Sequence, residues 1–439
     1  MGISASKVHI KLDKTVDVFY QLRRIGMIWQ RWFSVLMAVT IAWVTTVSPA
    51  YGVSDLTWEK IRGGSGTMSV SMIDVGQGNC VAIGCPNGKK ILADCGSTKG
   101  DQALKDLAVH YINYLLDGSQ FDYIVLSHGD KDHYNIIHRV VGSLTNPLIT
   151  LPEGDTPRFY PPGYVPKSGE LPEMTNYDPG FLNLLKNAKK NRNLRTIEST
   201  YFDKIGKPNP DLQCSAIQNE SNGIYVLAGN LAEGFAKNNN SIVLFLKYAN
   251  KAVKPFTIML PGDAETGGNP DIVNTIEKRY AKANFLSTDV MMASHHGAEK
   301  GITADSSFLD KTKPQVVVFS AGKKNTFNHP RCSAVNEISD AYLLKCQNHP
   351  LTRSIKQPVS YSMSASKKRK GEEFKSAKIT SYDSRFGTMD SGTVISLSDG
   401  NGKFSLYTCP FPRTDTSRSD WPDDFLEECT KMIDNKPTN

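Results

Sequence analysis

The segment SHGDKDHYN, residues 127–135, brings two histidines and two aspartates into six consecutive positions. In an extended loop alternate side chains point the same way, so His128, Asp130 and Asp132 can converge while His133 turns to the other side. Neutral imidazole nitrogens and carboxylate oxygens are ligands of divalent cations. One loop rarely completes two coordination shells, so a metal site here requires ligands from elsewhere in the chain.

Further side chains of these types follow apolar runs later in the sequence. Asp263 comes directly after IMLP in LPGDAE, His295 and His296 come after VMMA, and His329 comes after VVVFSAG. Of the nine histidines, five lie in such loops, whereas His9, His110, His138 and His349 have the setting of ordinary surface or helix residues. Four loops that each carry ligand chemistry at a strand end predict one shared site.

The elements that must position these residues indicate an α/β domain with its functional groups on loops after strands. Residues 146–235 are irregular and rich in Pro, Gly, Asn and Tyr, which predicts an insertion that either covers the site or is a surface excursion. Residues 391–408, with a DGNG turn, predict a terminal hairpin. Periodicity and apolar runs predict strands over 68–75, 80–85, 91–96, 121–127, 241–249, 255–263, 289–297 and 314–322, and helices over 101–116, 134–144 and 271–283.

The N-terminal segment predicts export. Arg23, Arg24 and Arg31 precede an apolar run from residue 33 to residue 47, and small or turn-forming residues follow up to Gly52. Such a run is short for a membrane span and suits a signal peptide, with translation from Met27 giving one of ordinary length. The alternatives are an uncleaved anchor with the domain outside, and a buried helix. We therefore expect residues 1–52 to be a flank and signal peptide, residues 66–408 to be the main domain and residues 409–439 to be a polar tail.

The charge balance excludes one class of function. The net charge is +7, but residues 1–52 hold six Lys or Arg and two Asp, so the rest of the chain carries only +3. A polycationic surface for nucleic acid is therefore not indicated. Local phosphate binding stays open at Lys323, Lys324, Arg331 and the KKRK run at 367–370, each of which is also typical of solvated surface.

All eight cysteines lie after the predicted cleavage point, and their even number fits an oxidising compartment. Cys80–Cys95 and Cys332–Cys346 are candidate disulfides, although spacing does not determine the pairing and several of these residues could be buried thiols.

Six motifs in a fixed order resemble those of metallo-β-lactamase-fold hydrolases, and more narrowly those of the extracytoplasmic hydrolase domain of ComEC-type DNA-uptake proteins. The resemblance spans residues 66–408 and includes the terminal hairpin, SGTVISLSDG. It implies a metallo-β-lactamase-like αββα sandwich, in which two mixed β-sheets are flanked by helices. The motifs are DVGQGN (74–79), LADCG (92–96), SHGDKDH (127–133), PGDAE (261–265), SHHG (294–297) and NHP (328–330).

The resemblance also implies roles for individual residues around two divalent metal ions, Mn²⁺, Mg²⁺ or Zn²⁺. Asp263 matches the carboxylate that bridges two metals, and Asp74 and Asp94 match acidic residues that brace the site from below. Asp132, His296 and His329 are the expected catalytic residues. The expected metal ligands are His128, Asp130, Asp132, His133, Asp263 and His295.

The sequence departs from the wider pattern at several positions. Asn79 stands where the family usually has Asp, Ala298 where it usually has Ser, and Asp130 where the wider superfamily has His. The middle metal histidine of that superfamily has no clear counterpart between residues 140 and 262, where Asn240 is the nearest candidate. Carboxylates in place of imidazoles shift the preference from Zn²⁺ towards Mn²⁺ or Mg²⁺.

These observations together predict an exported, metal-dependent phosphodiesterase or nuclease, with the substrate class implied by the resemblance. A dinuclear site of this kind lowers the pKa of bound water so that it attacks at neutral pH, and it neutralises charge on the reacting group. His329 or His296 would donate a proton to the leaving group or bind a non-bridging oxygen. The alternatives are a hydrolase of another ester, amide or lactone, and a catalytically weak binding or scaffold protein. The oligomeric state stays open.

Overall fold

The structure is a computed structural model, and the chain divides into two units, Met1–Val53 and Ser54–Asn439. All described residues lie in the second unit, so the predicted signal peptide is outside them. The described residues are 55–98, 102–141, 158–160, 178–190, 206–210, 212–216, 218–229, 238–251, 253–267, 271–280, 284–322, 327, 329–331, 334, 360–363, 377–380, 385–388, 392–412 and 420–435.

The first sheet contains eight described strands in the order β16-β15-β14-β1-β2-β3-β4-β5. Neighbours from β16 to β3 are antiparallel, whereas β3–β4 and β4–β5 are parallel. The strands are β1 (Met68–Met72), β2 (Cys80–Gly84), β3 (Lys90–Cys95), β4 (Tyr123–Val125), β5 (Arg158–Tyr160), β14 (Thr393–Ser398), β15 (Phe404–Cys409) and β16 (Thr430–Asn435).

The second sheet contains six described strands in the order β13-β10-β9-β8-β7-β6. Its strands from β8 to β13 run parallel, and β6, β7 and β8 form an antiparallel meander. The strands are β6 (Gly223–Ala228), β7 (Val243–Tyr248), β8 (Phe256–Leu260), β9 (Val290–Met292), β10 (Val316–Phe319) and β13 (Arg385–Gly387). A separate hairpin pairs β11 (Ser360–Met363) with β12 (Ala377–Thr380).

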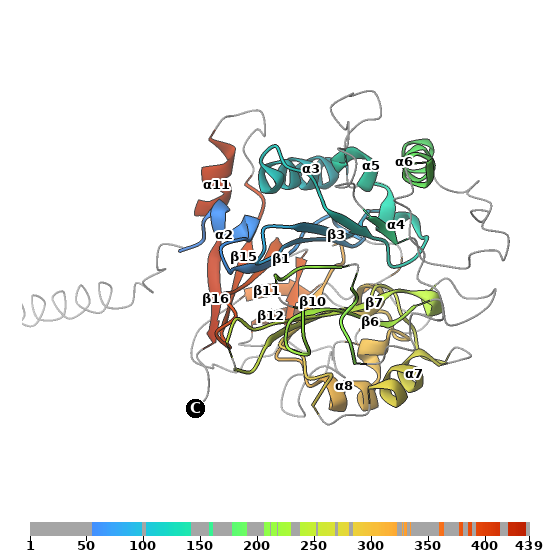
Figure 1. The fold of residues 1–439 in the computed structure, drawn as a ribbon. Coiled ribbons are helices and arrows are strands. Elements are labelled where there is room, and N and C mark those ends of the chain that lie inside the picture. Colours follow the sequence, from blue (N-terminus) through green and yellow to red (C-terminus); the bar gives the residue numbers. More distant parts are fainter. Residues whose placement is uncertain are drawn as a thin grey trace, which may run out of the picture. The chain divides into compact units, whose positions relative to one another are not determined.

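Helices cover the outer face of each sheet (Figure 1). On the first sheet lie α2 (Trp58–Arg62), α3 (Gln102–Leu116) and α11 (Trp421–Glu427), and on the second lie α7 (Ile272–Arg279) and α8 (Ser306–Thr312). α3 forms because Ala108, Tyr111, Ile112 and Leu115 recur at helical spacing and all are buried. The shorter helices are α4 (Lys131–Tyr134), α5 (Ile137–Val140) and α6 (Pro179–Lys190).

A third apolar core lies between the two sheets. Its members come from both of them, as Val70 and Ile83 from the first and Leu246 and Ile258 from the second illustrate. Strands such as β1, β2, β7 and β8 are buried along their whole length, so the sheets need cover on both sides, which the helices supply. The predicted αββα sandwich is therefore confirmed. In the part of the chain that the structure describes, no helix is long and apolar enough to cross a membrane.

Several elements differ from the sequence-based expectation. Of the helix expected over 134–144, the described residues form only α5, while α4 ends at Tyr134, the first residue of that expected helix. The region expected as an insertion, 146–235, contributes β5 to the first sheet and β6 to the second. The C-terminal region expected as a polar tail adds α11, whose Trp421 is fully buried, and β16, which pairs with β15. The KKRK run at 367–370 and the lysines at 323 and 324 lie outside the described residues.

Three disulfides join described cysteines: Cys80–Cys95, Cys85–Cys214 and Cys409–Cys429. The first confirms one of the two predicted pairs, whereas Cys332–Cys346 lies outside the described residues. Cys85–Cys214 spans 129 residues and joins the end of β2 in the first sheet to the segment before β6 in the second.

Candidate metal centre

The predicted ligands meet where loops leave the carboxyl ends of strands in both sheets. His128 and Asp130 follow β4 of the first sheet, and α4 then supplies Asp132 and His133. In the second sheet β8, β9 and β10 are parallel neighbours, so the loops that follow them lie at the same edge. These loops carry Asp263, the pair His295 and His296, and His329, respectively.

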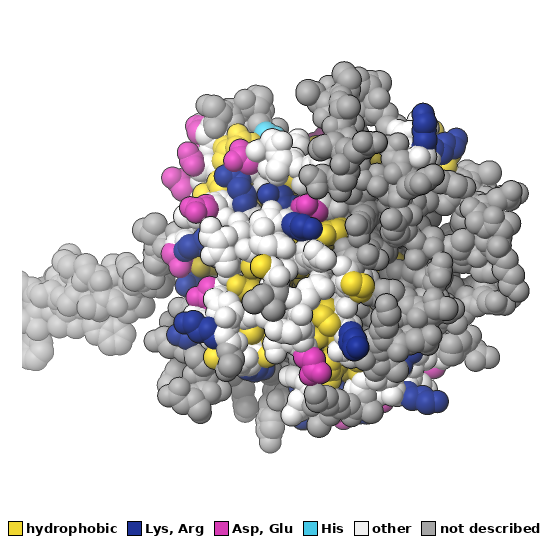
Figure 2. Space-filling model, viewed as in Figure 1, with side chains coloured by type: hydrophobic (Ala, Val, Ile, Leu, Met, Phe, Trp, Pro, Cys, Tyr) yellow, Lys and Arg dark blue, Asp and Glu magenta, His cyan; other side chains and the backbone are white. Residues whose placement is uncertain are grey.

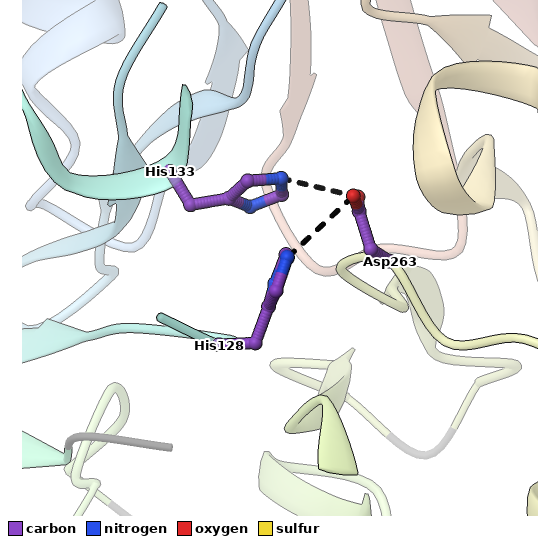
Figure 3. A group of neighbouring side chains, drawn as sticks. All are labelled: His128, His133 and Asp263. Carbon is purple, nitrogen blue, oxygen red and sulfur yellow. Dashed lines mark ion pairs between the residues drawn. The ribbon is translucent and has the colours of Figure 1, made fainter. Parts of the chain in front are cut away.

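His128, His133 and Asp263 form a first group whose ligand atoms all lie within 4.8 Å of one another (Figure 3). His133 Nε2 lies 3.1 Å from Asp263 Oδ1, and His128 Nε2 lies 3.6 Å from Asp263 Oδ2. Asp130 lies at its edge, with Oδ2 at 3.4 Å from His128 Nε2 and the side chain 37% exposed. Asp263, from the second sheet, thus faces the loop after β4 of the first sheet, which carries His128 and Asp130.

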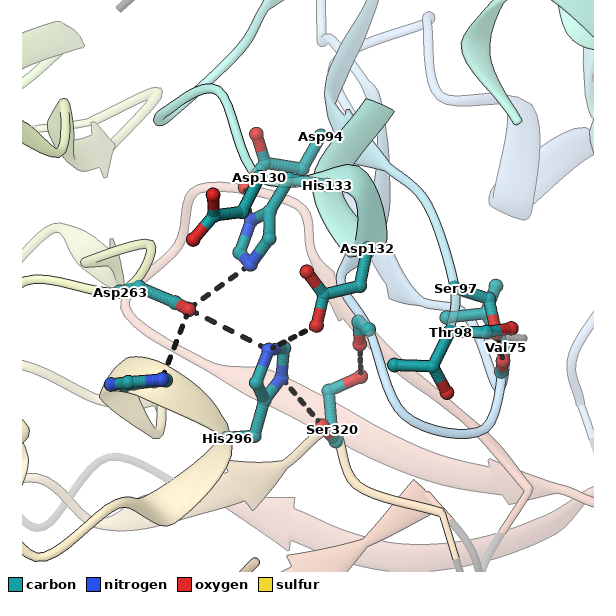
Figure 4. Close-up of polar contacts among 12 residues, drawn as sticks. Val75, Asp94, Ser97, Thr98, Asp130, Asp132, His133, Asp263, His296 and Ser320 are labelled. Atoms are coloured by element: carbon teal, nitrogen blue, oxygen red, sulfur yellow. Dashed lines mark hydrogen bonds and ion pairs between the residues drawn. The ribbon is translucent and has the colours of Figure 1, made fainter. Parts of the chain in front are cut away.

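A second group of the same kind contains Asp132, His133 and His296 (Figure 4). His296 Nε2 lies 3.4 Å from Asp132 Oδ2 and 3.7 Å from Asp263 Oδ1. His133 belongs to both groups. The two groups are therefore adjacent, with His133 and Asp263 between them.

Two hydrogen bonds fix which nitrogen of each shared imidazole faces the centre. His133 Nδ1 donates to Asp94 Oδ2 at 2.8 Å, and His296 Nδ1 donates to the Ser320 carbonyl at 2.8 Å. Asp94 also accepts from the backbone N–H and the hydroxyl of Ser127, both at 2.6 Å. These contacts leave both Nε2 atoms directed at the centre, as in metal sites whose ligating histidines are held from behind.

The backbone at His295 and His296 is in the left-handed region, with φ of 48° and 55°. For residues other than glycine such a conformation costs of order 1–3 kcal/mol each and is retained mainly at functional sites. The His295 N–H donates to the Gly262 carbonyl at 3.0 Å, which anchors this turn beside Asp263. As a result the two rings approach different oxygens of Asp263: His295 Nε2 lies 3.6 Å from Oδ2, and His296 Nε2 approaches Oδ1.

His295 has partners of its own that sequence reasoning missed. Its Nδ1 donates to Glu265 Oε1 at 2.6 Å, and the Asn238 side-chain amide donates to the same oxygen at 3.1 Å. Glu265 is the last residue of the PGDAE motif, two positions after Asp263. Its closeness to Asp263 in the sequence therefore could have indicated that it lies at the site. Of the two adjacent histidines, His296 is a member of the described groups that could hold an ion, although the sequence analysis predicts His295 as the ligand.

The remaining predicted residues lie around this centre. Asp74 Oδ1 accepts from the Gly76 N–H at 3.1 Å, which shapes the β1–β2 loop. Asn79 lines a small cavity between the sheets together with Asp94 and Ser127. His329 is buried against the other histidines, with its ring centroid 5.1 Å from that of His295 and 6.2 Å from that of His296. The side chain of Asn240 is not among those described.

Comparison with known proteins finds a family model that matches the part of the chain carrying the first ligand loop. Residues 73–189 match the model of the metallo-beta-lactamase superfamily. The domain has the metallo-β-lactamase fold.

One curated relative is similar over a larger part of the metallo-β-lactamase-fold domain. The chain is 26% identical over 273 residues to ComE operon protein 3 of Bacillus subtilis (strain 168), which covers 60% of this chain. The chain spans only 29% of that relative's length. The match confirms the resemblance that the ordered motifs predict.

Two solved structures are also similar at low scores. A diphosphatase from the PhnP family has a TM-score of 0.29 and 13% identity, with 58% of this chain and 87% of that chain covered. The long form of RNase Z from yeast has a TM-score of 0.33 and 10% identity, with 62% and 38% covered. At these scores the likenesses carry no argument about function.

Electrostatics in the metallo-β-lactamase-fold centre follow from burial opposed by close opposite charges. Burial would raise the pKa of Asp263, but His133, His296 and His128 hold it well below its usual value. Burial would lower the pKa of His133, but Asp263 and Asp94 raise it well above its usual value. Without metal the cluster is therefore an ion-pair network, and a cation binding to His133 must displace a proton.

The residues present fit a bound cation. Among the described side chains, Nε2 of His128, His133 and His296 and Oδ1 of Asp263 are buried, and their mutual contacts at 3.1–3.7 Å do not have hydrogen-bond geometry. Buried polar atoms in folded proteins nearly always have a hydrogen-bond partner. Orphaned nitrogens and a carboxylate oxygen that lie together are what a divalent cation requires as ligands.

His329 has the opposite electrostatic character. Burial, and the charges of the adjacent His296 and His295, lower the pKa of His329 to about 3. It is therefore a neutral imidazole at pH 7, able to form hydrogen bonds without carrying charge.

Proposed function

We propose that this chain is a metal-dependent hydrolase that cleaves phosphodiesters, and in particular a nuclease. The observation that carries the proposal is the pair of adjacent His/Asp groups with orphaned ligand atoms, joined through His133. Divalent cations bound there would act as Lewis acids and activate water. The group of His128, His133 and Asp263 would hold one cation, with Asp130 at its edge, and the group of Asp132, His133 and His296 would hold the other.

The side chains of this site have separate roles in such a reaction. Asp94 and the Ser320 carbonyl keep the two shared imidazoles oriented. Asp132 is a carboxylate at neutral pH, because His296 and His133 outweigh the effect of burial and lower its pKa, so it can orient a nucleophilic water. Neutral His329 would hydrogen-bond a non-bridging oxygen of the substrate. His295, held by Glu265, approaches the same Asp263 oxygen as His128 and would be the proton donor for a leaving group.

The phosphodiester substrate is supported by the donor set and by the resemblance to the ComEC-type domain. Carboxylates at positions 130, 132 and 263 favour Mn²⁺ or Mg²⁺, the ions commonly paired with phosphate substrates. Basic and acidic side chains of the described residues are interspersed on the face shown in Figure 2. On this face, recognition would therefore depend on the metal centre and local contacts rather than on a broad basic surface.

The proposal can be tested with a metal measurement and a substrate panel. The purified chain, dialysed against Mn²⁺, Mg²⁺ or Zn²⁺, should retain about two ions and should cleave labelled single- or double-stranded DNA or bis(p-nitrophenyl) phosphate. Asp263→Asn should lose both properties. Asp310→Asn, an exposed position on α8, is the matched control and should keep them.

Two results would contradict this proposal in different ways. Turnover of a lactone or simple ester without any phosphodiester cleavage would make the substrate class wrong. A chain that binds only trace metal, unchanged by Asp263→Asn, would instead support a binding or scaffold role.

We also propose that the domain acts outside the cytoplasm. Three disulfides between described cysteines and the predicted signal peptide support export, since such bonds persist in oxidising compartments. N-terminal sequencing of the mature protein should begin near residue 53. An intact Met1 in a cytosolic fraction would contradict export.

A further inference from the structure

The loop after β10 places an exposed aromatic ring beside the candidate centre. Phe327 is 50% exposed, and Val253 is the other large hydrophobic side chain exposed among the described residues. Single exposed apolar side chains are common on protein surfaces, so exposure alone assigns no role. The position of Phe327 is what distinguishes it from Val253.

The Phe327 ring is stacked on a residue of the site. Its centroid lies 6.1 Å from that of His329 at an interplanar angle of 29°, and the His329 ring in turn contacts that of His295 at 5.1 Å. A row of three rings thus leads from Asp263 and its histidines to the surface. His329 is buried, so Phe327 is the member of the row whose face is available to a ligand.

A cation follows in the same segment. The Arg331 N–H donates to the Gly297 carbonyl at 2.8 Å, which ties this segment to the turn that carries His295 and His296. An exposed ring and an arginine four residues later, beside a centre proposed to cleave phosphodiesters, match the pattern by which proteins bind single strands, with bases stacked on aromatic rings and phosphates paired with basic side chains.

We propose that Phe327 is the stacking platform for a nucleobase next to the scissile phosphodiester of a single-stranded nucleic acid, and that Arg331 binds a neighbouring phosphate. The inference rests on the proposed function for the identity of the scissile group. It adds to that function a preference for substrates with an unpaired base beside the cleaved bond. Stacking does not depend on base identity, so the platform predicts little sequence selectivity.

The test is equilibrium binding of the full chain to a fluorescein-labelled single-stranded DNA and to the same strand with abasic residues. Fluorescence anisotropy is measured in EDTA, where metal-dependent cleavage is absent, and again with Mn²⁺. Phe327→Ala should weaken binding of the base-containing strand roughly 10-fold and leave abasic binding unchanged. Phe327→Trp should retain the affinity for the base-containing strand, and Arg331→Gln should weaken binding of both strands. Val253→Ala should have the same affinities as the parent.

Hydrolysis of bis(p-nitrophenyl) phosphate, measured in parallel, separates the two proposals. Active parent protein with equal affinity for base-containing and abasic strands would overturn the platform and leave the proposed function standing. Base-dependent binding that Phe327→Ala removes, in a chain that hydrolyses no phosphodiester, would support the platform and overturn the function. A parent that binds neither strand would also overturn the platform.

Discussion

Asp94 fixes the orientation of the His133 imidazole, so that Nε2 is the nitrogen directed at the candidate metal centre. It receives hydrogen bonds from the Ser127 N–H, the Ser127 hydroxyl and His133 Nδ1, so both carboxylate oxygens are used. Its backbone φ is 55°, a left-handed conformation that Asp and Asn tolerate better than most residues. The short side chain can therefore point back beneath the loop that carries the ligands.

Asp94→Asn should weaken metal binding without unfolding the domain. Asparagine keeps the shape and tolerates the left-handed backbone, but its side chain has one acceptor oxygen for three donors. Partners behind a ligating histidine are worth about 10–100-fold in metal affinity, and we expect a loss of that size by isothermal titration with Mn²⁺. Asp122→Asn is the control, since Asp122 likewise accepts a backbone N–H, from Lys90 at 2.8 Å, at the other end of the same strands. Equal affinity of Asp94→Asn and the parent would contradict this role.

The sequence identifies the residues of the centre better than it identifies their contacts. Histidine and aspartate after apolar runs mark the loops, because strand ends are where a sheet exposes side chains. Whether His295 or His296 faces the cluster depends on two consecutive left-handed residues, which no residue type at those positions indicates. Glu265 and Ser320 become partners only when strands distant in sequence pair.

At the scale of elements, the β1–β2 loop must pass very close to the loop that carries the ligands. Gly78 has a φ of 152°, and a Cβ there would lie 2.2 Å from the Gly96 carbonyl oxygen and 2.8 Å from that of Asp132. The Asn79 N–H donates to the same Asp132 carbonyl at 3.0 Å. Glycine at this position therefore helps to place the Asp132 side chain.

Gly78→Ala should both destabilise the domain and displace Asp132. All three nearest neighbours of the added methyl are backbone atoms, so the loops must separate, and we expect a loss of more than about 2 kcal/mol in the free energy of unfolding. Gly88→Ala is the control. The φ of Gly88 is also positive, at 85°, but nothing lies within 4 Å of a Cβ built there. Its cost should be about 1 kcal/mol, with metal binding unchanged. Urea unfolding and metal titration measure the two effects.

His110 on α3 should make stability depend on pH. The ring packs against Trp421 and Tyr114, with centroids 4.5 and 5.2 Å away, and burial lowers its pKa below the usual 6.5. Below pH 6.5 the unfolded chain then binds a proton that the folded chain does not, so stability falls as the pH decreases towards the folded pKa. His110→Phe keeps a ring and removes the titration. Between pH 7 and pH 5 its free energy of unfolding should fall less than that of the parent, and parallel curves would contradict the assignment.

At the scale of the whole described domain, the sequence predicts the sheets more fully than their edges. Central strands such as β7 and β8 are apolar runs buried on both faces, so their sequence is sufficient evidence for them. The sequence does not predict β6, because this strand follows a long irregular segment. It does not predict β16, because the sequence of that strand, TKMIDN, is mostly polar. Both are edge strands that depend on a neighbouring strand and, in each case, on a nearby disulfide.

Cys85–Cys214 should stabilise the domain more than Cys409–Cys429 does. The first closes 129 residues and joins the two sheets, whereas the second closes 20 residues between β15 and the start of β16. Because a cross-link restricts the unfolded chain more when its loop is longer, we expect losses of about 4–5 and about 3 kcal/mol for the two paired Cys→Ser variants. The measurement is urea unfolding under oxidising conditions with each pair replaced separately. With dithiothreitol the parent should become less stable than either variant is without it. If the Cys85→Ser/Cys214→Ser variant lost no more than the Cys409→Ser/Cys429→Ser variant, the inter-sheet contacts alone would hold β6 in place.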